Sequence, residues 1–502
     1  MYIHFPENKM FDYIEVYGRG AAEVTSIVFD SRKSQKGAAF FCMKGLNQDG
    51  EAFIDEALQK GSTVIVSQNG KRMKELSLSY PALTFIEVLN TRTAAAQFSA
   101  AFYHNSCRDL FLTGVTGTNG KTTVASYIRS ILNVLGLPAG MIGTNGIWSS
   151  REKLPFRGST PTTPEAPDLH RIFSEYAEHG EKAAVMEVSS IALDQKRVEG
   201  IQFDVAVHTN LSPEHMEYHK TFENYREAKL KLFKQADKAV VNADDVLGAE
   251  ILSVFPGRVL TYSLNRDVQA DIHAYAITPS ETGTSAVIEM NGHAQHVFLP
   301  VFGEYNIANI LAAVCTALHG GYSLSRVLEA AEKIEPVEGR FQVVWGKEKQ
   351  KIIIDYAHTP TALDQLLREV KKQNGRRVIL MLMGIGIRDF SKMPRMAATA
   401  EGRADQIVVS VDHPGDHEPQ VIIDQVLSGF RHPEDPSIST ALNREEAVRK
   451  ALSLSSEGDI VLLTSGCING AQIVKGQSIP HSDEKVIEEY FEQNGCGQQR
   501  SI

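Results

Sequence analysis

The stretch GVTGTNGKTT at residues 114–123 constrains the fold more than any other part of the chain. It follows a strand-like run, LFLTGV, and precedes TTVASYIRSILNVLG, whose apolar spacing is typical of an amphipathic helix. A glycine-rich turn between a strand and a helix lets backbone N–H groups converge on phosphate oxygens at the helix N-terminus. The usual phosphate-loop pattern requires glycine where this chain has Val115, so the loop departs from that pattern by one position.

The two residues that follow the loop favour phosphate binding over a purely structural turn. Lys121 would place a point charge near the β- and γ-phosphates of a nucleotide, and Thr122 offers a hydroxyl to Mg²⁺. The alternative is an ordinary strand-to-helix turn that is capped by Asn119 or Thr122. Such a turn does not need a Lys-Thr pair, so the sequence predicts a nucleotide site.

Three blocks of alternating patterns follow one another along the chain. Residues 1–109 combine short apolar runs with a helical stretch and predict a small α/β domain. Residues 110–338 contain the glycine loop and further strand and helix patterns, which predict a parallel sheet covered on both faces. Residues 339–502 repeat the alternation and predict a second doubly wound, Rossmann-like domain. The predicted fold class is therefore α/β with three domains.

The composition argues against several classes of protein. A net charge of −10 offers no general attraction to nucleic acid or to an anionic membrane. No apolar run is long enough for a membrane-spanning helix, and the first residues do not resemble a signal peptide. The five cysteines are scattered and odd in number, which is typical of reduced thiols. We expect a cytoplasmic monomer that has no nucleic-acid partner and no membrane insertion.

Further motifs give the chain a resemblance to the Mur ligase family that runs nearly from end to end. They are DSR at 30–32, TPTTP at 160–164, EVSS at 187–190, TNLSPEHMEYH at 209–219, AKLKLF at 228–233, EYNIAN at 304–309, GR at 339–340 and DYAHTP at 355–360. Their order and spacing are similar to those of members that extend UDP-N-acetylmuramoyl-dipeptide. The resemblance implies that ATP activates a substrate carboxylate as an acyl phosphate. The amine of a free amino acid then forms the amide, with release of ADP and phosphate.

The resemblance also assigns a role to each block. Residues 1–109 would bind the UDP-sugar substrate, residues 110–338 would bind ATP, and residues 339–502 would bind the amino acid. By the same resemblance, six side chains would hold the UDP-linked substrate: Ser31, Thr162, Thr163, Ser190, Gln195 and Arg197. The expected ATP contacts are Gly117, Thr118, Asn119, Gly120, Lys121, Thr122, Thr123, Asn306, Arg340, Asp355, His358 and Lys392.

Four residues are expected to carry the chemistry: Lys121, Glu187, His215 and Lys229. Glu187 closes the strand pattern AAVME, where ligands bind in open α/β sheets, and would hold Mg²⁺ together with Thr122. The alternative for Glu187 is a solvated strand end. The resemblance implies that His215 serves a second Mg²⁺, although a lone histidine in a loop is more often an ordinary surface or core residue.

Lys229 is the most informative of these positions. It shares one helical stripe with Phe222, Tyr225 and Phe233. A lysine on an apolar stripe must be paired, neutralised or modified, unless it lies at the edge and extends to water. In the family the matching lysine is carbamylated, which implies N6-carboxylysine at Lys229 as a ligand of the second Mg²⁺.

The amino-acid pocket is where the chain departs from the family pattern. The candidate residues are Arg388, Asp412, His413, Ser465 and Asn469. Members that add diaminopimelate carry D-N-P-R, whose arginine binds the distal carboxylate, but this chain has D-H-P-G at 412–415. The motifs G-G-D-R-D and G-K-G-H-E become GIRD at 386–389 and SGCIN at 465–469. On the UDP-sugar side, Ile191 and Glu51 replace family histidines.

These observations predict an active amide ligase with an altered choice of amino acid. One alternative keeps the ligation chemistry but moves it to another carboxylate, in specialised-metabolite or cell-surface polymer synthesis. A second alternative is a non-catalytic nucleotide-binding protein. The presence of all four expected catalytic residues argues against that second alternative.

Overall fold

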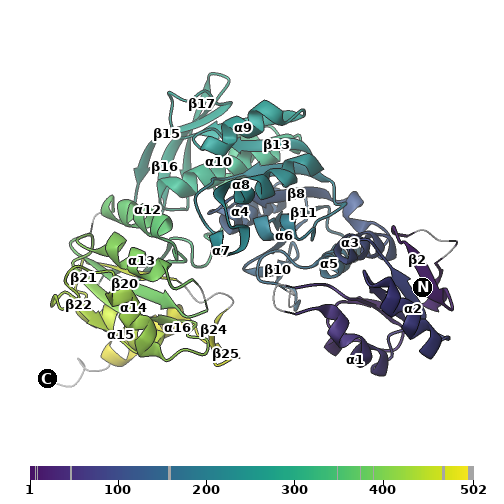
Figure 1. The fold of residues 1–502 in the computed structure, drawn as a ribbon. Helices are drawn as coiled ribbons and strands as arrows, with labels where there is room; N and C mark the ends of the chain where they lie inside the picture. The colour runs from purple at the N-terminus through teal and green to yellow at the C-terminus, as the bar shows by residue number, and fades with distance from the viewer. Residues whose placement is uncertain are drawn as a thin grey trace. The chain divides into compact units, whose positions relative to one another are not determined.

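The computed structural model describes residues 1–5, 7, 10–45, 48–156, 160–346, 349–373, 375–387, 389–465 and 470–495. The chain forms two compact units (Figure 1). Unit 1 contains Met1–Thr261 and Cys315–Ser323, and unit 2 contains Tyr262–Val314 and Leu324–Ile502.

The first sheet of unit 1 is small and mostly parallel. Its strand order is β2 (Glu15–Gly18), β7 (Thr84–Glu87), β6 (Val64–Ser67), β5 (Ala38–Phe41) and β4 (Ser26–Val28), and only β2 is antiparallel to its neighbour. β1 (Tyr2–His4) pairs with β3 (Ala21–Glu23). The helices are η1 (Ser31–Lys33), η2 (Gly50–Phe53), α1 (Ile54–Gln59), α2 (Gly70–Ser79) and α3 (Thr91–Phe102). β5 and β6 are buried throughout, as expected for strands that are covered on both faces.

The second sheet of unit 1 positions the glycine loop. Its order is β10 (Gly146–Trp148), β9 (Ala139–Gly143), β11 (Ala183–Glu187), β8 (Phe111–Thr116), β12 (Phe203–His208) and β13 (Ala236–Asn242). All but β10 run parallel, so β8 ends between the carboxyl ends of β11 and β12. The predicted parallel sheet is confirmed.

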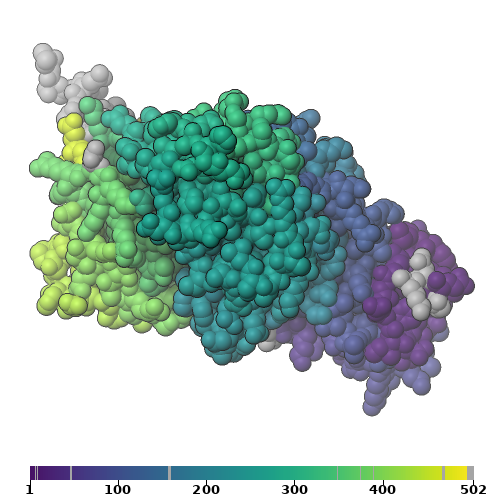
Figure 2. All heavy atoms as spheres, turned by 90° about the horizontal axis from the view of Figure 1, so that it is seen from above, coloured from purple at the N-terminus to yellow at the C-terminus, as the bar shows by residue number. Residues whose placement is uncertain are grey.

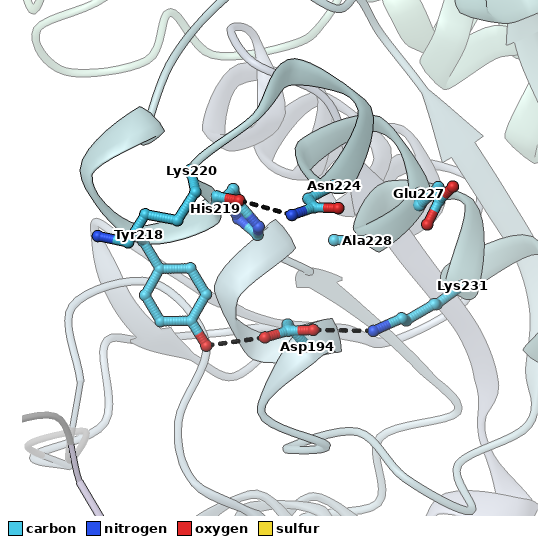
Figure 3. A pocket seen from close by; sticks show the side chains of 8 residues that line it. All are labelled: Asp194, Tyr218, His219, Lys220, Asn224, Glu227, Ala228 and Lys231. Atoms are coloured by element: carbon cyan, nitrogen blue, oxygen red, sulfur yellow. Dashed lines mark hydrogen bonds and ion pairs between the residues drawn. The ribbon is translucent and has the colours of Figure 1, made fainter.

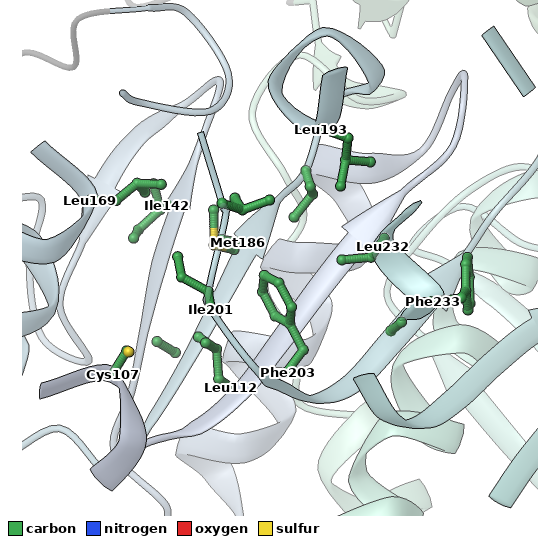
Figure 4. Close-up of a cluster of buried hydrophobic side chains, with 14 of the residues drawn as sticks. Cys107, Leu112, Ile142, Leu169, Met186, Leu193, Ile201, Phe203, Leu232 and Phe233 are labelled. Atoms are coloured by element: carbon green, nitrogen blue, oxygen red, sulfur yellow. The ribbon is translucent and has the colours of Figure 1, made fainter. Parts of the chain in front are cut away.

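Helices connect and cover these strands. They are η3 (Ser106–Asp109), α4 (Lys121–Val134), α5 (Ala166–Glu178), α6 (Ser190–Asp194), α7 (Met216–His219), α8 (Phe222–Leu230), η4 (Lys231–Gln235) and α9 (Val246–Val254). Figure 4 shows part of the core of this sheet, in which Leu112, Met186 and Phe203 are fully buried.

This core explains the glycine that precedes the loop. Gly114 lies inside β8, not in the loop. A Cβ atom at Gly114 would lie 3.0 Å from side-chain atoms of both Phe203 and Leu232. Gly114 is therefore a packing residue of the strand, and its offset from the usual phosphate-loop pattern says nothing against nucleotide binding.

Unit 2 begins with an antiparallel layer that the strand patterns did not predict. β15 (Ile272–Pro279), β16 (Thr284–Met290) and β17 (His293–Leu299) form a meander. The boundary between the units runs through β14 (Arg258–Ser263), which pairs with β15 at Tyr262. α10 (Glu304–His319) and α11 (Leu324–Ala331) follow.

The rest of unit 2 is the predicted second doubly wound domain. Its sheet has the order β18 (Gln342–Trp345), β19 (Lys351–Asp355), β23 (Ile460–Thr464), β20 (Val378–Ile385), β21 (Gln406–Asp412) and β22 (Ile438–Thr440). Only β18 is antiparallel. The helices are α12 (Pro360–Lys371), α13 (Lys392–Ala400), α14 (Pro419–Leu427), α15 (Arg444–Leu454) and α16 (Asp483–Gly495). β24 (Ala471–Val474) and β25 (Gln477–Pro480) form a hairpin.

In a space-filling view, the residues of this sheet and its helices, light green to yellow, form one continuous body, as do the purple residues of the first sheet (Figure 2). Within the described ranges, no helix is both long and apolar enough to cross a membrane.

Candidate active site

The glycine loop is held in a conformation that requires glycine. Gly117 has φ = 152°, and a Cβ atom there would lie 1.8 Å from Thr209 Oγ1. Gly120, at φ = 84°, caps α4 in the left-handed region that glycine adopts without strain. The Lys121 ammonium donates to the carbonyl oxygens of Gly117 (2.9 Å) and Thr118 (2.8 Å). Its charge thus lies over the loop, at the positive end of the α4 dipole.

The loop is fastened to the residues that follow β12. The N–H groups of Thr118 and Asn119 donate to Asn210, at 2.8 Å to its carbonyl oxygen and 2.9 Å to Oδ1. Thr209 Oγ1 donates to the Asn119 carbonyl at 2.6 Å. Sequence analysis quoted Thr209 and Asn210 only as part of a motif and assigned them no role. Their position directly after a predicted strand was the one available signal.

Glu187 lies at the end of β11 and is 1% exposed, so its interpretation as a solvated strand end is wrong. Its Oε1 accepts from the N–H of Thr144 at 2.7 Å, and its Oε2 accepts from the Thr144 hydroxyl at 3.2 Å. β11 is the direct neighbour of β8, with Glu187 paired to Val115. A buried carboxylate beside a phosphate loop is a favourable ligand for a hard cation.

Lys229 is buried on the inner stripe of α8, so the alternative in which it extends to water is wrong. Its Nζ lies 4.6 Å from the centre of the Tyr225 ring. Among the described residues, its ammonium has no hydrogen-bond or ion-pair partner. Burial lowers the pKa of Lys229 well below its usual value, Lys121 lowers it further, and Glu214 and Asp245 oppose the shift. A lysine in this environment is a reactive neutral amine more readily than an ordinary cation.

His215 begins α7 in the left-handed region, with φ = 59°. Its Nδ1 lies 3.3 Å from Glu217 Oε1, and its Nε2 lies 4.0 Å from Glu214 Oε2. Burial lowers the pKa of His215, while Glu214 raises it. The neutral imidazole that burial favours is the form that binds metals. Glu214 is itself buried and was not among the site residues expected from the sequence.

A buried histidine–carboxylate pair supports the end of β12. His208 Nε2 lies 2.8 Å from Asp245 Oδ1, and Asp245 Oδ2 accepts from the N–H of Leu211 at 2.9 Å. Burial raises the pKa of Asp245, but the bonds from His208 and from backbone N–H groups outweigh it and lower the pKa overall. This pair fixes the segment that fastens the glycine loop. Nothing local in the sequence indicated it.

In their unmodified form, only some of the expected ligands can bind Mg²⁺. The described ranges contain no group of three His, Cys, Asp or Glu residues that could hold a metal ion. Thr122 and Glu187 offer the oxygen ligands that Mg²⁺ prefers, whereas an unmodified lysine offers none. Lys229 therefore fits a metal site only after conversion to an anion.

Several residues expected to bind the UDP-linked substrate come together around Arg197. Its guanidinium donates to Thr160 Oγ1 (2.9 Å), to the Thr163 carbonyl (2.8 Å) and to Gln195 Oε1 (2.7 Å). It also pairs with Glu165 at 3.2 Å. The Thr163 hydroxyl donates to the Glu187 carbonyl at 3.0 Å, which joins this group to the end of β11.

The other three expected substrate contacts have different partners. Thr162 lies 3.3 Å from Thr144 through their hydroxyls. Ser190 and His219, both buried, are 2.9 Å apart. Ser31 belongs to the first sheet and donates to Glu56 at 2.6 Å.

A pocket of about 400 Å³ lies against the face of α8 that points away from Lys229. It is lined by Asp194, Tyr218, His219, Lys220, Asn224, Glu227, Ala228 and Lys231. Asp194 accepts a hydrogen bond from Tyr218 and one from Lys231, each at 2.9 Å (Figure 3). The helix that carries the buried lysine therefore separates Lys229 from a polar pocket.

In unit 2, Arg340, Asp355 and His358 come together at the end of β19. Asp355 accepts from the N–H groups of Phe341 and Ala357, each at 2.8 Å, and burial raises its pKa. Arg340 lies over the Tyr356 ring at 4.9 Å, and His358 Nδ1 lies 3.0 Å from the Tyr356 carbonyl.

The other two expected ATP contacts of unit 2 lie on helices. Asn306 is 1% exposed on α10 and donates to the Phe302 carbonyl at 2.9 Å. Lys392 is the first residue of α13.

Asp412 ends β21, His413 directly follows it, and Ser465 follows β23, but Arg388 and Asn469 lie outside the described residues. Asp412 Oδ1 accepts from Gln472 at 2.9 Å. His413 Nδ1 accepts from the N–H of Ile473 at 2.9 Å, so the proton of the neutral ring sits on Nε2.

Gly415, at the position where the resemblance predicts an arginine, is packed against the β24–β25 hairpin. Gly415 donates to the Ile473 carbonyl at 3.1 Å and accepts from the N–H of Lys475 at 2.7 Å. Its φ is 61°, and a Cβ atom there would lie 2.8 Å from Ile387 Cγ2. Position 415 is therefore shaped for glycine and has no room for a longer side chain without movement.

Comparison with known families matches three successive stretches of the chain. Residues 23–103 match "Mur ligase family, catalytic domain", residues 115–317 match "Mur ligase middle domain", and residues 339–467 match "Mur ligase, glutamate ligase domain". With the three main sheets described above, these matches show a three-domain α/β fold that has a central parallel sheet. The boundaries at 109 and 338 remain predictions.

Curated relatives match over nearly the whole chain. The chain is 34% identical over 492 residues to the UDP-N-acetylmuramoyl-L-alanyl-D-glutamate–2,6-diaminopimelate ligase of Clostridium perfringens (strain 13 / Type A), covering 96% of this chain and 98% of that protein. It is 35% identical over 471 residues to the protein of the same name from Coxiella burnetii (strain RSA 493 / Nine Mile phase I), covering 92% and 94%.

Solved structures show the same fold. A structure of a UDP-N-acetylmuramoyl-L-alanyl-D-glutamate–2,6-diaminopimelate ligase matches with a TM-score of 0.65 and 26% identity, over 94% of this chain and 95% of that chain. The MurF ligase of Thermotoga maritima in complex with ADP matches with a TM-score of 0.63 and 19% identity, over 94% and 97%. The second likeness concerns the fold alone.

Proposed function

The chain belongs to the Mur ligase family, and from this premise we propose that it adds a free amino acid to UDP-N-acetylmuramoyl-dipeptide. As a family member it is an ATP-dependent ligase of peptidoglycan-precursor synthesis. The observation that carries the specific proposal is the pair of buried groups on either side of the glycine loop. Glu187 ends one neighbouring strand, and Lys229 lies on the helix that follows the other.

The first step joins the substrate carboxylate to the γ-phosphate of ATP. Both groups are anionic, so cationic charge must lie between them. Lys121, held over the loop carbonyls, supplies one such charge. When bound at Thr122 and Glu187, Mg²⁺ would further neutralise the phosphate oxygens. The carboxylate oxygen attacks phosphorus, the bond to ADP breaks, and an acyl phosphate forms.

The second step forms the amide. The neutral amine of the amino acid attacks the acyl carbon, phosphate leaves, and the amine loses a proton. We place the amino acid at the ends of β21 and β23, where Asp412, His413 and Ser465 lie. Arg340, Asp355 and His358 are further proposed nucleotide contacts.

Lys229 is proposed to act as a carbamate. Its amine would attack CO₂, form a new N–C bond and release one proton, which leaves a carboxylate at a position that now offers only nitrogen. The lowered pKa and the lack of a partner among the described residues support this step, because only a neutral amine is nucleophilic. The carbamate at Lys229 would offer Mg²⁺ the oxygen ligands that it prefers, and His215 would add a ring nitrogen.

The pocket chemistry favours a small or neutral amino acid, with lysine second and diaminopimelate third. Losing the charged partner of a buried carboxylate costs on the order of 2–5 kcal/mol. Gly415 cannot supply that partner, and His413 already accepts an N–H at Nδ1. The named relatives are diaminopimelate ligases, so this ranking separates the chain from them.

ADP release in the presence of UDP-N-acetylmuramoyl-dipeptide tests the proposal. A pool of amino acids that includes lysine and diaminopimelate should raise ADP release, and omission of either the dipeptide or the pool should abolish it. Competition among single amino acids then gives the ranking. No ADP release with any of them would contradict the function, and the highest kcat/KM for diaminopimelate would contradict only the pocket argument.

A second candidate is ligation to a different carboxylate. The replacements at Glu51 and Ile191 favour it, because both lie in motifs expected to bind the UDP-sugar. Glu51 accepts from Asn69 at 3.0 Å and also from Ser67, so it is part of a polar network of the first domain. ADP release with another acid, but not with UDP-N-acetylmuramoyl-dipeptide, would support this candidate.

The reaction is proposed to occur in the cytoplasm, with the enzyme as a monomer. Cys42, Cys107 and Cys315 are buried thiols, which fits a reducing compartment.

A further inference from the structure

Arg444 in unit 2 is a fully buried arginine that takes no part in the proposed chemistry. Arg444 is the first residue of α15 and is 0% exposed. Burying a guanidinium is unfavourable unless its donors are satisfied, and the start of a helix is the wrong end of the dipole for a cation. The position therefore requires strong partners.

Those partners join the two strand ends that carry the expected amino-acid pocket. Arg444 binds Asp483 with two nitrogens, at 2.9 and 2.6 Å. Its third nitrogen donates to the carbonyl oxygens of Thr464 (3.1 Å) and Ser465 (2.8 Å), and lies 3.5 Å from Asp412 Oδ2. One side chain thus contacts the end of β21, the end of β23 and the start of α16.

The backbone at these strand ends needs such support. Ser465 and His413 both have positive φ, at 59° and 43°, a region that non-glycine residues rarely adopt. Each is held by a contact from outside its own segment. Arg444 binds the Ser465 carbonyl, and the N–H of Ile473 binds the His413 ring.

We propose that Arg444 is a positioning residue for the acceptor amino acid, because it holds the ends of β21 and β23 at the separation that the pocket requires. The proposal rests on the proposed function. It predicts a selective effect: loss of the guanidinium should weaken use of the amino acid far more than use of ATP or of the UDP-linked substrate.

The test compares Arg444→Lys with Arg377→Lys. Arg377 binds Asp459 with two nitrogens, at 3.4 and 2.6 Å, and a carbonyl at 3.3 Å, but at the opposite ends of β20 and β23. Lysine keeps the charge and loses the two-nitrogen geometry in both variants. The acceptor is the amino acid that gives the fastest ADP release with wild-type enzyme.

Arg444→Lys should raise the KM for the amino acid by about tenfold or more, while the KM for ATP changes by less than about twofold. Arg377→Lys should change neither KM. An unchanged amino-acid KM in Arg444→Lys, or an equal rise in all three KM values, would overturn the proposal. If Arg444→Lys does not fold, the double variant Arg444→Met/Asp483→Asn, which leaves no unpaired charge between these two residues, takes its place and must show the same selective rise.

Amide hydrogen exchange separates this proposal from the proposed function. Arg444→Lys should exchange faster than wild type at residues 411–415 and 464–465, whereas Arg377→Lys should not. Should the wild-type enzyme release no ADP with any amino acid, the proposed function fails. Unchanged exchange at these residues would then overturn the positioning role on its own.

Discussion

Two buried basic side chains, one in each unit, have opposite surroundings. Lys229 is 1% exposed, faces an aromatic ring and has no ion-pair partner among the described residues. Arg444 is 0% exposed and is bound by a carboxylate, two carbonyls and a second nearby carboxylate. The pKa of Lys229 is lowered by burial, while the Arg444 guanidinium helps to lower the pKa of Asp483 against the effect of burial. A buried cation with full pairing supports structure, whereas a buried amine without such pairing fits the modification proposed for Lys229.

The strongest test of this contrast is the removal of the Lys229 amine. Lys229→Ala should reduce turnover by at least about 100-fold, because the proposed carbamate ligand is lost. Added short carboxylic acids should restore part of the activity by replacing the missing anion. ADP release measures both effects. The control is Lys231→Ala, which removes a half-buried lysine two residues further on that pairs with Asp194. Near-normal activity of Lys229→Ala would refute the carbamate.

The two cations should also differ in the sign of their effect on stability. Arg444→Met leaves the buried Asp483 with His481 as its remaining partner, and should lower the free energy of unfolding by about 3–5 kcal/mol. Lys229→Met removes an unpaired buried amine and should raise it by about 1 kcal/mol or more. Urea unfolding in Mg²⁺-free, CO₂-depleted buffer measures both. A loss of stability in Lys229→Met would mean that the amine has a partner after all.

A third buried group, His170 on α5, should make the stability of the protein depend on pH. Neither of its ring nitrogens has a partner within the described chain, and burial lowers its pKa from 6.5 to about 4. The folded state therefore disfavours the protonated ring. The part of the free energy of unfolding that depends on the neutral His170 ring is fully present above pH 6.5. It is lost as the pH falls from 6.5 towards 4, and the loss is about 3 kcal/mol. His170→Leu should remove this part of the acid dependence, as measured by urea unfolding across that range. Parallel pH profiles of variant and wild type would exclude it.

The smallest expected effect concerns a residue with no charge. Gly114→Ala should lower the free energy of unfolding by about 1–3 kcal/mol, because its Cβ atom would crowd Phe203 and Leu232 in the core. Nucleotide binding should remain, since Gly114 lies in β8 and not in the loop. Loss of ATP-analogue binding in a folded Gly114→Ala protein would show that the strand and the loop are not separate in function.

The features that could be predicted from the sequence are those whose interacting residues lie close together along the chain. The strand end at Glu187 and the stripe that holds Lys229 are local patterns, and the structure confirms both placements. The strand and helix patterns likewise predicted both large parallel sheets. Their ends shifted slightly, as where α8 stops at Leu230 and Phe233 falls in η4.

The residues that were missed act through distant partners. Asn210 binds the glycine loop from 91 positions away, and Arg444 meets Asp483 over 39. No periodicity or spacing rule connects such pairs. The β15–β17 meander was missed for another reason: its strands have mixed burial patterns and lack the continuous apolar runs of buried parallel strands.

The bonds between the glycine loop and Thr209–Asn210 bear on when the protein first becomes able to bind a nucleotide during its synthesis. A nascent chain that ends before residue 209 contains the whole loop but lacks Thr209 and Asn210, which fasten it. Closing a connection of this length is slow compared with forming α4. On the ribosome, the loop should therefore remain for some time without its folded conformation. ATP-analogue binding by stalled chains of increasing length should appear only after β12 and its following turn have emerged from the exit tunnel.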